Sequence, residues 1–168
     1  MDFRQAVMQD LPQLKDMYKR IIKNMNEQNI QIWDDIYPCE FFEDDIKNNQ
    51  LYILLNNGEI VSAFVLSDTN SGETAVEWKD NHAKAVYIDR LGVNIKYLKK
   101  GLGSLMLDKA KEIAKTLNAE YLRLFVVDIN IPAIQLYTKK EFVKVNGVYN
   151  EIFDDGFVLH EHGYEIKL

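Results

Sequence analysis

The feature that most constrains this chain is a pair of glycines between an apolar stretch and a helical stretch. Residues 85–93, AVYIDRLGV, are apolar on both faces, as in a strand covered on two sides. Residues 97–114, YLKKGLGSLMLDKAKEIA, then place Gly101 and Gly103 directly before an amphipathic run. The first N–H groups of a helix lack partners inside it, and glycine lets a ligand approach the backbone closely. The order of strand, glycine turn and helix therefore predicts a phosphate site.

Two other phosphate-binding motifs do not fit these residues. A Walker loop has a lysine directly after its last glycine, whereas Ser104 follows Gly103 here. A dinucleotide fingerprint needs a third glycine where this sequence has Met106. The residues alone leave one alternative open, which is a glycine-capped turn that holds no ligand.

The rest of the chain predicts one mixed α/β domain over residues 1–168, since this length suffices for one sizeable core and no repeat appears. Asn57-Gly58 is a strong tight-turn signal between two apolar stretches. Asp10 is a candidate N-cap for the first helix. The expected strands are 2–7, 51–56, 59–66, 85–93, 121–127, 142–149 and 157–168, and the expected helices are 11–25, 39–49, 102–117 and 130–140.

Composition narrows the function classes. The formal net charge is −6 and no basic stripe is visible, which argues against a nucleic-acid partner. No segment approaches the ~20 apolar residues that span a bilayer, so we expect no membrane partner. Cys39 is the single cysteine and cannot form an internal disulfide, which favours a cytoplasmic location. The acidic clusters, such as Asp34-Asp35, are either solvated surface or an attraction for a cationic substrate.

Two motifs together carry a family resemblance. Residues 90–110, RLGVNIKYLKKGLGSLMLDKA, and residues 130–142, NIPAIQLYTKKEF, resemble the GNAT superfamily of N-acetyltransferases. That family typically has a Gln/Arg-x-x-Gly-x-Gly/Ala loop before a helix, and later Asn-x-x-Ala-x-x-Leu-Tyr-x-x-x-Gly-Phe. This sequence departs from the pattern at Leu98, in place of glutamine or arginine, and at Glu141, in place of glycine.

The resemblance implies a single-domain GNAT-like fold, with a mixed, mostly antiparallel central sheet flanked by helices on both faces. It also implies acetyl-CoA as the donor, without a metal. In the family the pyrophosphate lies on the glycine loop, and the pantetheine arm runs beside the preceding strand, where Gly92 leaves room for it. The implied donor-binding residues are Leu91, Gly92, Val93, Leu98, Lys99, Lys100, Gly101, Leu102, Gly103, Ser104 and Asn130.

The resemblance also assigns roles in proton transfer. Tyr137 matches the family tyrosine that acts as general acid near the coenzyme sulfur; the alternative is a core tyrosine. The backbone N–H of Val93 is the expected donor to the thioester carbonyl. Asp89 shares the face of Leu91 and Val93 if the strand alternates regularly, which makes it a candidate base or substrate-binding residue. Pairing with an arginine, or a water chain without a single base, are the alternatives.

The acceptor side is expected between the first two helices. The stretch 30–38, IQIWDDIYP, contains Trp33, Asp35 and Tyr37, an aromatic and acidic set that suits an ammonium group. A structured surface loop is the alternative. Together with Asp89, these residues predict that the acceptor carries a positive charge.

The predicted activity is an acetyl-CoA-dependent N-acetyltransferase, an acyltransferase that moves acetyl to a primary amine of a small molecule or peptide. The resemblance implies direct transfer in a ternary complex, and dimers are common in the family, so a homodimer is compatible with it. One competing function is a non-catalytic acyl-CoA-binding sensor on the same fold. Another is an interaction module whose glycine turn holds no ligand.

Overall fold

The computed structural model describes residues 1–168 and divides them into two compact units. Unit 1 comprises residues 1–66 and 89–106, and unit 2 comprises residues 67–88 and 107–168. The chain therefore passes between units inside strand β5 (Ala85–Val93) and inside helix α3 (Leu102–Thr116). The single domain expected over residues 1–168 stays a prediction.

The elements confirm the predicted mixed α/β fold. The other helices are α1 (Leu11–Glu27), α2 (Phe42–Lys47) and α4 (Ile131–Lys139), with short 3-10 turns η1 (Met8–Asp10), η2 (Cys39–Phe41) and η3 (Ile95–Tyr97). The other strands are β1 (Asp2–Gln5), β2 (Leu51–Asn56), β3 (Glu59–Ser67), β4 (Val76–Glu77), β6 (Tyr121–Val127), β7 (Val143–Lys144), β8 (Asn146–Gly147), β9 (Tyr149–Ile152) and β10 (Val158–Lys167). Eight strands form a mostly antiparallel sheet in the order β1-β2-β3-β5-β6-β10-β7, with β9 paired to β10.

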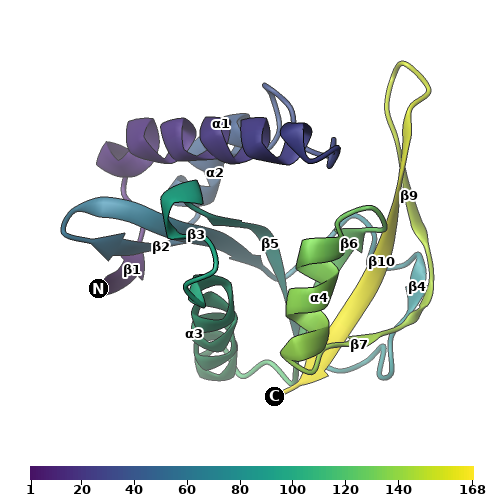
Figure 1. Cartoon of the computed structure of the whole chain (residues 1–168). Helices are drawn as coiled ribbons and strands as arrows, with labels where there is room; N and C mark the ends of the chain where they lie inside the picture. The colour runs from purple at the N-terminus through teal and green to yellow at the C-terminus, as the bar shows by residue number, and fades with distance from the viewer. The chain divides into compact units, whose positions relative to one another are not determined.

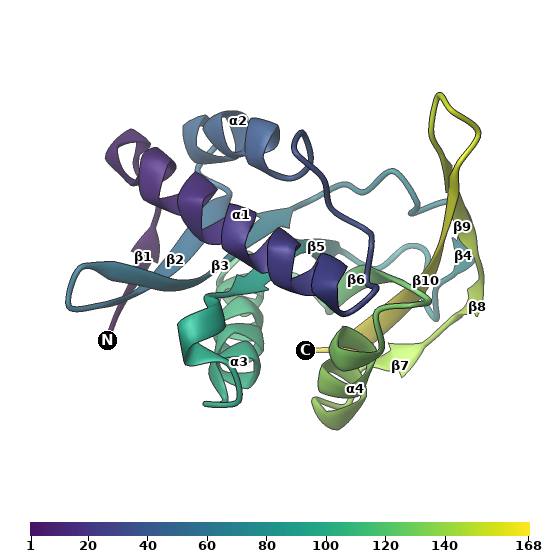
Figure 2. The same ribbon diagram turned by 45° about the horizontal axis from the view of Figure 1, so that its top comes forward.

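Unit 1 is built around the apolar face of α1, which lies across β2 and β3 in Figures 1 and 2. The helix repeats apolar residues at helical spacing, and that stripe is buried against α2 and the strands. β2 and β3 join at the predicted turn, where Asn57 and Gly58 take φ values of 49° and 80°. The most deeply buried side chains of this core include Leu14, Met17, Tyr18, Phe42, Leu51, Ile53 and Ile60.

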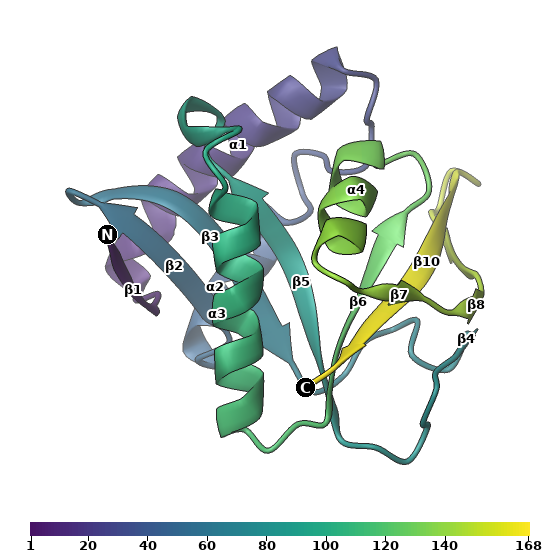
Figure 3. The same cartoon turned by 60° about the horizontal axis from the view of Figure 1, so that its bottom comes forward.

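Unit 2 centres on the antiparallel pair β6 and β10, with α4 beside them in Figure 3. The first residues of β5 pair in parallel with β6. The single strand expected over 142–149 is instead divided into β7, β8 and the start of β9. Gly147 explains the break: its φ is 101°, and an added Cβ would lie 2.9 Å from the Ala75 carbonyl oxygen. The backbone thus turns away from β10 to pair closely with β4.

Cys39 and the helices bear on two sequence-based expectations. Cys39 is buried, and burial raises the pKa of its thiol, which disfavours the reactive thiolate. None of the helices combines the length and the apolar character that a membrane crossing requires.

Candidate functional site

The glycine turn has the backbone geometry that an anion site needs. Leu98 to Gly101 are exposed, and Lys99 and Gly101 both take left-handed φ values, of 60° and 77°. The first bond of α3 runs from the Leu105 N–H to the Gly101 carbonyl at 3.1 Å. The amides of residues 102–104 therefore precede the helical hydrogen-bond pattern and are free to bind a phosphate. An added Cβ at Gly101 would meet no atom within 4 Å, so the turn is open on that side.

The residue that leads into this turn is firmly fixed. Asn94 is only 2% exposed, yet all its polar groups have partners. Its backbone N–H donates to the Val61 carbonyl at 2.9 Å, and its side-chain amide donates to the Ile60 carbonyl at 3.1 Å. Its side-chain oxygen accepts from the Lys96 N–H at 3.2 Å, which caps η3. β3 thus holds the chain just before the exposed turn.

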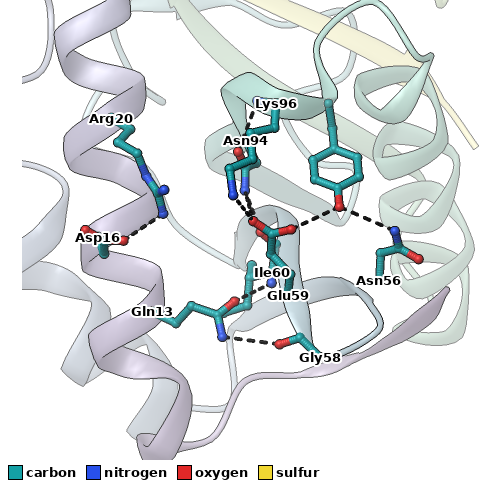
Figure 4. A network of polar contacts seen from close by, with 10 residues as sticks. Gln13, Asp16, Arg20, Asn56, Gly58, Glu59, Ile60, Asn94 and Lys96 are labelled. Carbon is teal, nitrogen blue, oxygen red and sulfur yellow. Dashed lines mark hydrogen bonds and ion pairs between the residues drawn. The ribbon is translucent and has the colours of Figure 1, made fainter.

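A polar cleft of about 350 Å³ lies beside this anchor in unit 1. Its wall includes Gln13 and Arg20 of α1, residues 57–60 of the hairpin, and Asn94. Figure 4 shows Gln13 bridging the helix to the hairpin, where its side-chain amide donates to the Gly58 carbonyl at 3.2 Å and its oxygen accepts from the Ile60 N–H. These partners are 45 or more residues apart in sequence, and no motif signals them.

Gly92 is required for a reason different from the expected one. We expected a side chain there to crowd the pantetheine arm. An added Cβ would instead lie 2.8 Å from Cζ of Tyr18 and 2.9 Å from its hydroxyl. The Gly92 carbonyl also accepts from the Ser62 hydroxyl at 2.7 Å. The glycine therefore makes room for a tyrosine of α1, whatever else the strand binds.

Tyr18 also contacts the strand two residues earlier. Its hydroxyl donates to the carbonyl of Arg90, and burial raises the pKa of this phenol, so it stays a neutral donor. Arg90 has a φ of 56°, which is not a strand conformation. Regular alternation is therefore interrupted between Asp89 and Leu91, and it no longer supports placing them on one face. The role of Asp89 stays a prediction.

The segment expected to bind the acceptor packs around the chain's own arginine. The Arg90 guanidinium lies 5.2 Å from the ring centroid of Tyr37 and 5.2 Å from that of Phe41. Trp33 packs instead on Tyr18, with ring centroids 5.6 Å apart. Asp35 is exposed, whereas its neighbour Asp34 accepts from the Ile36 and Tyr37 N–H groups at 2.8 Å. The aromatic contact expected for an ammonium ligand is thus made, at Tyr37, by Arg90.

Asp45 is a buried carboxylate that sequence reasoning missed. It lies on α2, 7% exposed, and its oxygens are 3.4 and 3.5 Å from Nη1 of Arg90. Burial raises the pKa of Asp45 to about 6, because the attraction of Arg90 only partly offsets it and Asp89 and Asp44 add repulsion. The 45 residues between the partners explain why no local pattern predicts the pair.

Unit 2 holds the two remaining predicted residues. Asn130 caps α4, with its side-chain oxygen accepting from the Ala133 N–H at 3.4 Å. Tyr137 is 9% exposed, and its ring centroid lies 6.0 Å from that of Phe142. The capping interpretation of Asn130 is therefore confirmed. Burial of the Tyr137 ring fits both a core residue and a general acid whose hydroxyl reaches a ligand.

The chain contains no cluster of three or more histidine, cysteine, aspartate or glutamate side chains arranged to hold a metal ion. The donor set around the glycine turn consists of backbone amides and lysines, which bind phosphate oxygens rather than cations. The site's chemistry is thus that of anion recognition.

Comparisons with solved structures support the fold. An acetyltransferase of the GNAT family from Staphylococcus aureus Mu50 is 21% identical, with a TM-score of 0.71 over 99% of this chain and 98% of that one. A GNAT-family acetyltransferase from Listeria monocytogenes 4b F2365 is 19% identical, with a TM-score of 0.75 over 99% and 94%. Arabidopsis thaliana NAA60, solved with a bisubstrate analogue, is 19% identical, with a TM-score of 0.69 over 99% and 97%.

At these identities the structures establish the fold, and the sequence itself establishes the family. No curated protein matches the chain significantly. Residues 14–142, however, match the model of the acetyltransferase (GNAT) family, which covers well over half of the chain and both motifs that carry the resemblance. The chain therefore belongs to the acetyltransferase (GNAT) family.

Proposed function

We propose that this protein transfers an acetyl group from acetyl-CoA to a primary amine, directly and within a ternary complex. Family membership implies acyl transfer from acetyl-CoA. The observation that carries the proposal is the exposed glycine turn, with left-handed Lys99 and Gly101 directly before α3. A bisubstrate analogue bound to Arabidopsis NAA60 supports, by analogy, a site that holds both substrates together.

The donor is assigned to the residues around that turn. The amides of Leu102, Gly103 and Ser104 would bind the pyrophosphate, with Lys99 and Lys100 supplying positive charge. This backbone recognition does not need the glutamine or arginine that Leu98 replaces. The strand Leu91, Gly92 and Val93 and the capping residue Asn130 complete the proposed donor site.

The chemistry needs one proton removed and one delivered. Asp89, or water held near it, would take a proton from the ammonium so that the amine nitrogen can attack the thioester carbon. The Val93 N–H would stabilise the negative charge on the carbonyl oxygen. As the carbon–sulfur bond breaks, Tyr137 would donate its phenolic proton to the thiolate. The products are the acetylated amine and free coenzyme A.

The acceptor is proposed to be a cationic primary amine on a small molecule or a peptide. Trp33, Asp35 and Tyr37 remain the proposed acceptor residues, although Arg90 already occupies one face of Tyr37. The attraction for a cation would then come from carboxylates such as Asp35 and Asp89. An anionic best substrate in a panel of amines would contradict this assignment.

The test is release of free thiol from acetyl-CoA across that panel, with Tyr137→Phe as the decisive variant. The substitution keeps the ring beside Phe142 and removes only the hydroxyl, so turnover should fall by ~10²-fold while coenzyme binding survives. The melting temperature should stay near that of the wild type.

The competing outcomes separate the alternatives. Full turnover in Tyr137→Phe would make the tyrosine a packing residue. Coenzyme binding without thiol release for any amine would favour an acyl-CoA sensor. No binding at all would favour an interaction module.

A further inference from the structure

Two lysines near the glycine turn have different electrostatic environments. The Lys96 ammonium forms an ion pair with Oε1 of Glu59 at 2.9 Å. The Lys100 ammonium instead lies over the ring of Tyr97, 4.8 Å from its centroid. A carboxylate neutralises its partner, whereas an aromatic face orients a cation and leaves its N–H groups able to bind an anion. Lys100 is therefore the better placed to meet a phosphate.

The ring beneath Lys100 is itself held in place. The Tyr97 hydroxyl donates to Oε2 of Glu59 at 3.0 Å and accepts from the Asn56 side-chain amide at 3.4 Å. The Tyr97 N–H donates to the Asn94 carbonyl at 2.8 Å. Both ends of this residue are thus tied to the β2–β3 hairpin, directly or through the buried Asn94.

Glu59 is the centre of this network, as Figure 4 shows. It is the first residue of β3, immediately after the tight turn at Asn57-Gly58. Its carboxylate accepts from Lys96, from Tyr97 and, at 3.5 Å, from the Asn94 side-chain amide. Hydrogen bonds from Lys96 and Tyr97 lower the pKa of Glu59, which keeps it charged.

We propose that Glu59 is a positioning residue for the donor: through Tyr97 it places Lys100 at the glycine turn, where Lys100 binds a phosphate of coenzyme A. Lys96 is excluded from that role by its ion pair with Glu59. The inference rests on the proposed acetyl-CoA site. It adds a carboxylate to that site that no phosphate contacts, which no phosphate-binding motif would suggest.

The sign of the Glu59 effect distinguishes positioning from simple charge. A carboxylate near a polyanion repels it, so removing Glu59 should tighten coenzyme binding if charge alone matters. Removing it should weaken binding if the carboxylate holds Tyr97 and Lys100 in place. Glu59→Gln keeps an oxygen that can accept from the Tyr97 hydroxyl, and it should therefore rescue most of what Glu59→Ala loses.

The experiment is calorimetric titration of the full chain with coenzyme A, 3′-dephospho-coenzyme A and pantetheine. Loss of one charge-assisted contact predicts that Lys100→Met weakens coenzyme A binding by roughly tenfold. Lys96→Met, the matched loss of the same charge four residues away, should change it by less than about threefold because that charge is already neutralised. Pantetheine, which has no phosphate, should bind Lys100→Met and wild type equally. Retention of the defect with 3′-dephospho-coenzyme A would assign Lys100 to the pyrophosphate, and its loss would assign Lys100 to the 3′-phosphate.

The outcomes keep this proposal separate from the proposed function. Wild-type binding together with equal effects of Lys100→Met and Lys96→Met would overturn the inference alone. Tighter or unchanged binding by Glu59→Ala would also overturn it. A wild type that binds no coenzyme A would refute the donor site and this inference with it. Melting temperatures near wild type in all variants would show that the affinities report the site.

Discussion

Each unit of the molecule holds one arginine on a strand against aromatic rings, and the two are satisfied very differently. In unit 2, Arg123 is buried; its Nε donates to Glu165 at 3.1 Å, and one terminal nitrogen donates to the Asp80 carbonyl at 2.7 Å. Its guanidinium lies 4.6 Å from the ring centroid of Trp78. In unit 1, Arg90 has aromatic contacts too, but its Nε is buried without a hydrogen-bond partner and its carboxylate partner is 3.4 Å away.

The difference indicates what each arginine does. Buried polar groups are almost always paired, because an unpaired one loses its hydration without compensation. Arg123 obeys this rule and serves as a fixed part of the core. Arg90 departs from it directly after Asp89, the proposed base, and directly before Leu91 of the proposed donor strand. We interpret the loose pairing as a feature of a working surface rather than of a core.

The largest expected effect is on the stability of unit 2. Arg123→Met would leave the Glu165 carboxylate buried, with only the Lys79 N–H at 2.8 Å to bind it. Removing one partner of a buried ion pair typically costs ~3–5 kcal/mol, so we expect a loss of that size in the free energy of unfolding. Chemical denaturation measures it. A loss below about 1 kcal/mol would mean that the pair contributes little and that the comparison is wrong.

Arg90→Met should cost much less. The remaining Asp45 carboxyl can take up a proton, and the apolar side chain keeps the contacts with Tyr37 and Phe41. We expect a loss of about 1 kcal/mol, typical of a weakly coupled pair. The same denaturation measurement provides a direct ranking. Equal losses for Arg90→Met and Arg123→Met would remove the distinction between the two arginines.

The smallest effect concerns the pH dependence contributed by Asp45. The pKa of this carboxyl is about 6 in the fold against an ordinary 3.8, so the folded state binds the proton more tightly. Its stabilising contribution is complete below about pH 3.8 and is lost as the pH rises through about 6. The Asp45→Asn variant has an amide in place of this carboxyl, and an amide does not titrate. The melting temperature of wild type minus that of the variant should therefore be larger near pH ~4.5 than near pH ~7.5.

The opposite order would show that Arg90 lowers the pKa of Asp45 below its ordinary value. In that case the pair would be tight despite its geometry. A control variant at the exposed Asp35 should show no comparable pH dependence, since that carboxylate stays in water.

Sequence reasoning succeeded where local backbone chemistry determines the structure. The turn at Asn57-Gly58, the capping of α4 by Asn130 and the glycine turn before α3 all depend on residues close in sequence. The family motifs lie in these same local segments. This is why the fold and the location of the proposed donor loop could be predicted from the sequence.

Side-chain contacts across long sequence separations could not be predicted. Tyr18 and Arg90 are 72 residues apart, and Glu59 and Tyr97 are 38 apart. Gly92 illustrates the limit: a side chain is indeed excluded there, but by Tyr18 of α1. The left-handed Arg90 likewise interrupts an alternation that the residue types alone suggest is regular. The proposed acceptor side consists largely of such contacts, so its residues remain the least predictable part of the site.

The most direct test of the account is whether coenzyme A binds the glycine turn, measured by the thermal shift that it produces. Gly101→Asp and Gly101→Asn have nearly the same shape, both residues tolerate the left-handed φ of 77°, and an added Cβ meets nothing there. Only Asp places a negative charge against the pyrophosphate. We predict that wild type and Gly101→Asn keep the shift and that Gly101→Asp and Gly103→Asp lose it. A wild-type shift in both aspartate variants would contradict the placement of the donor.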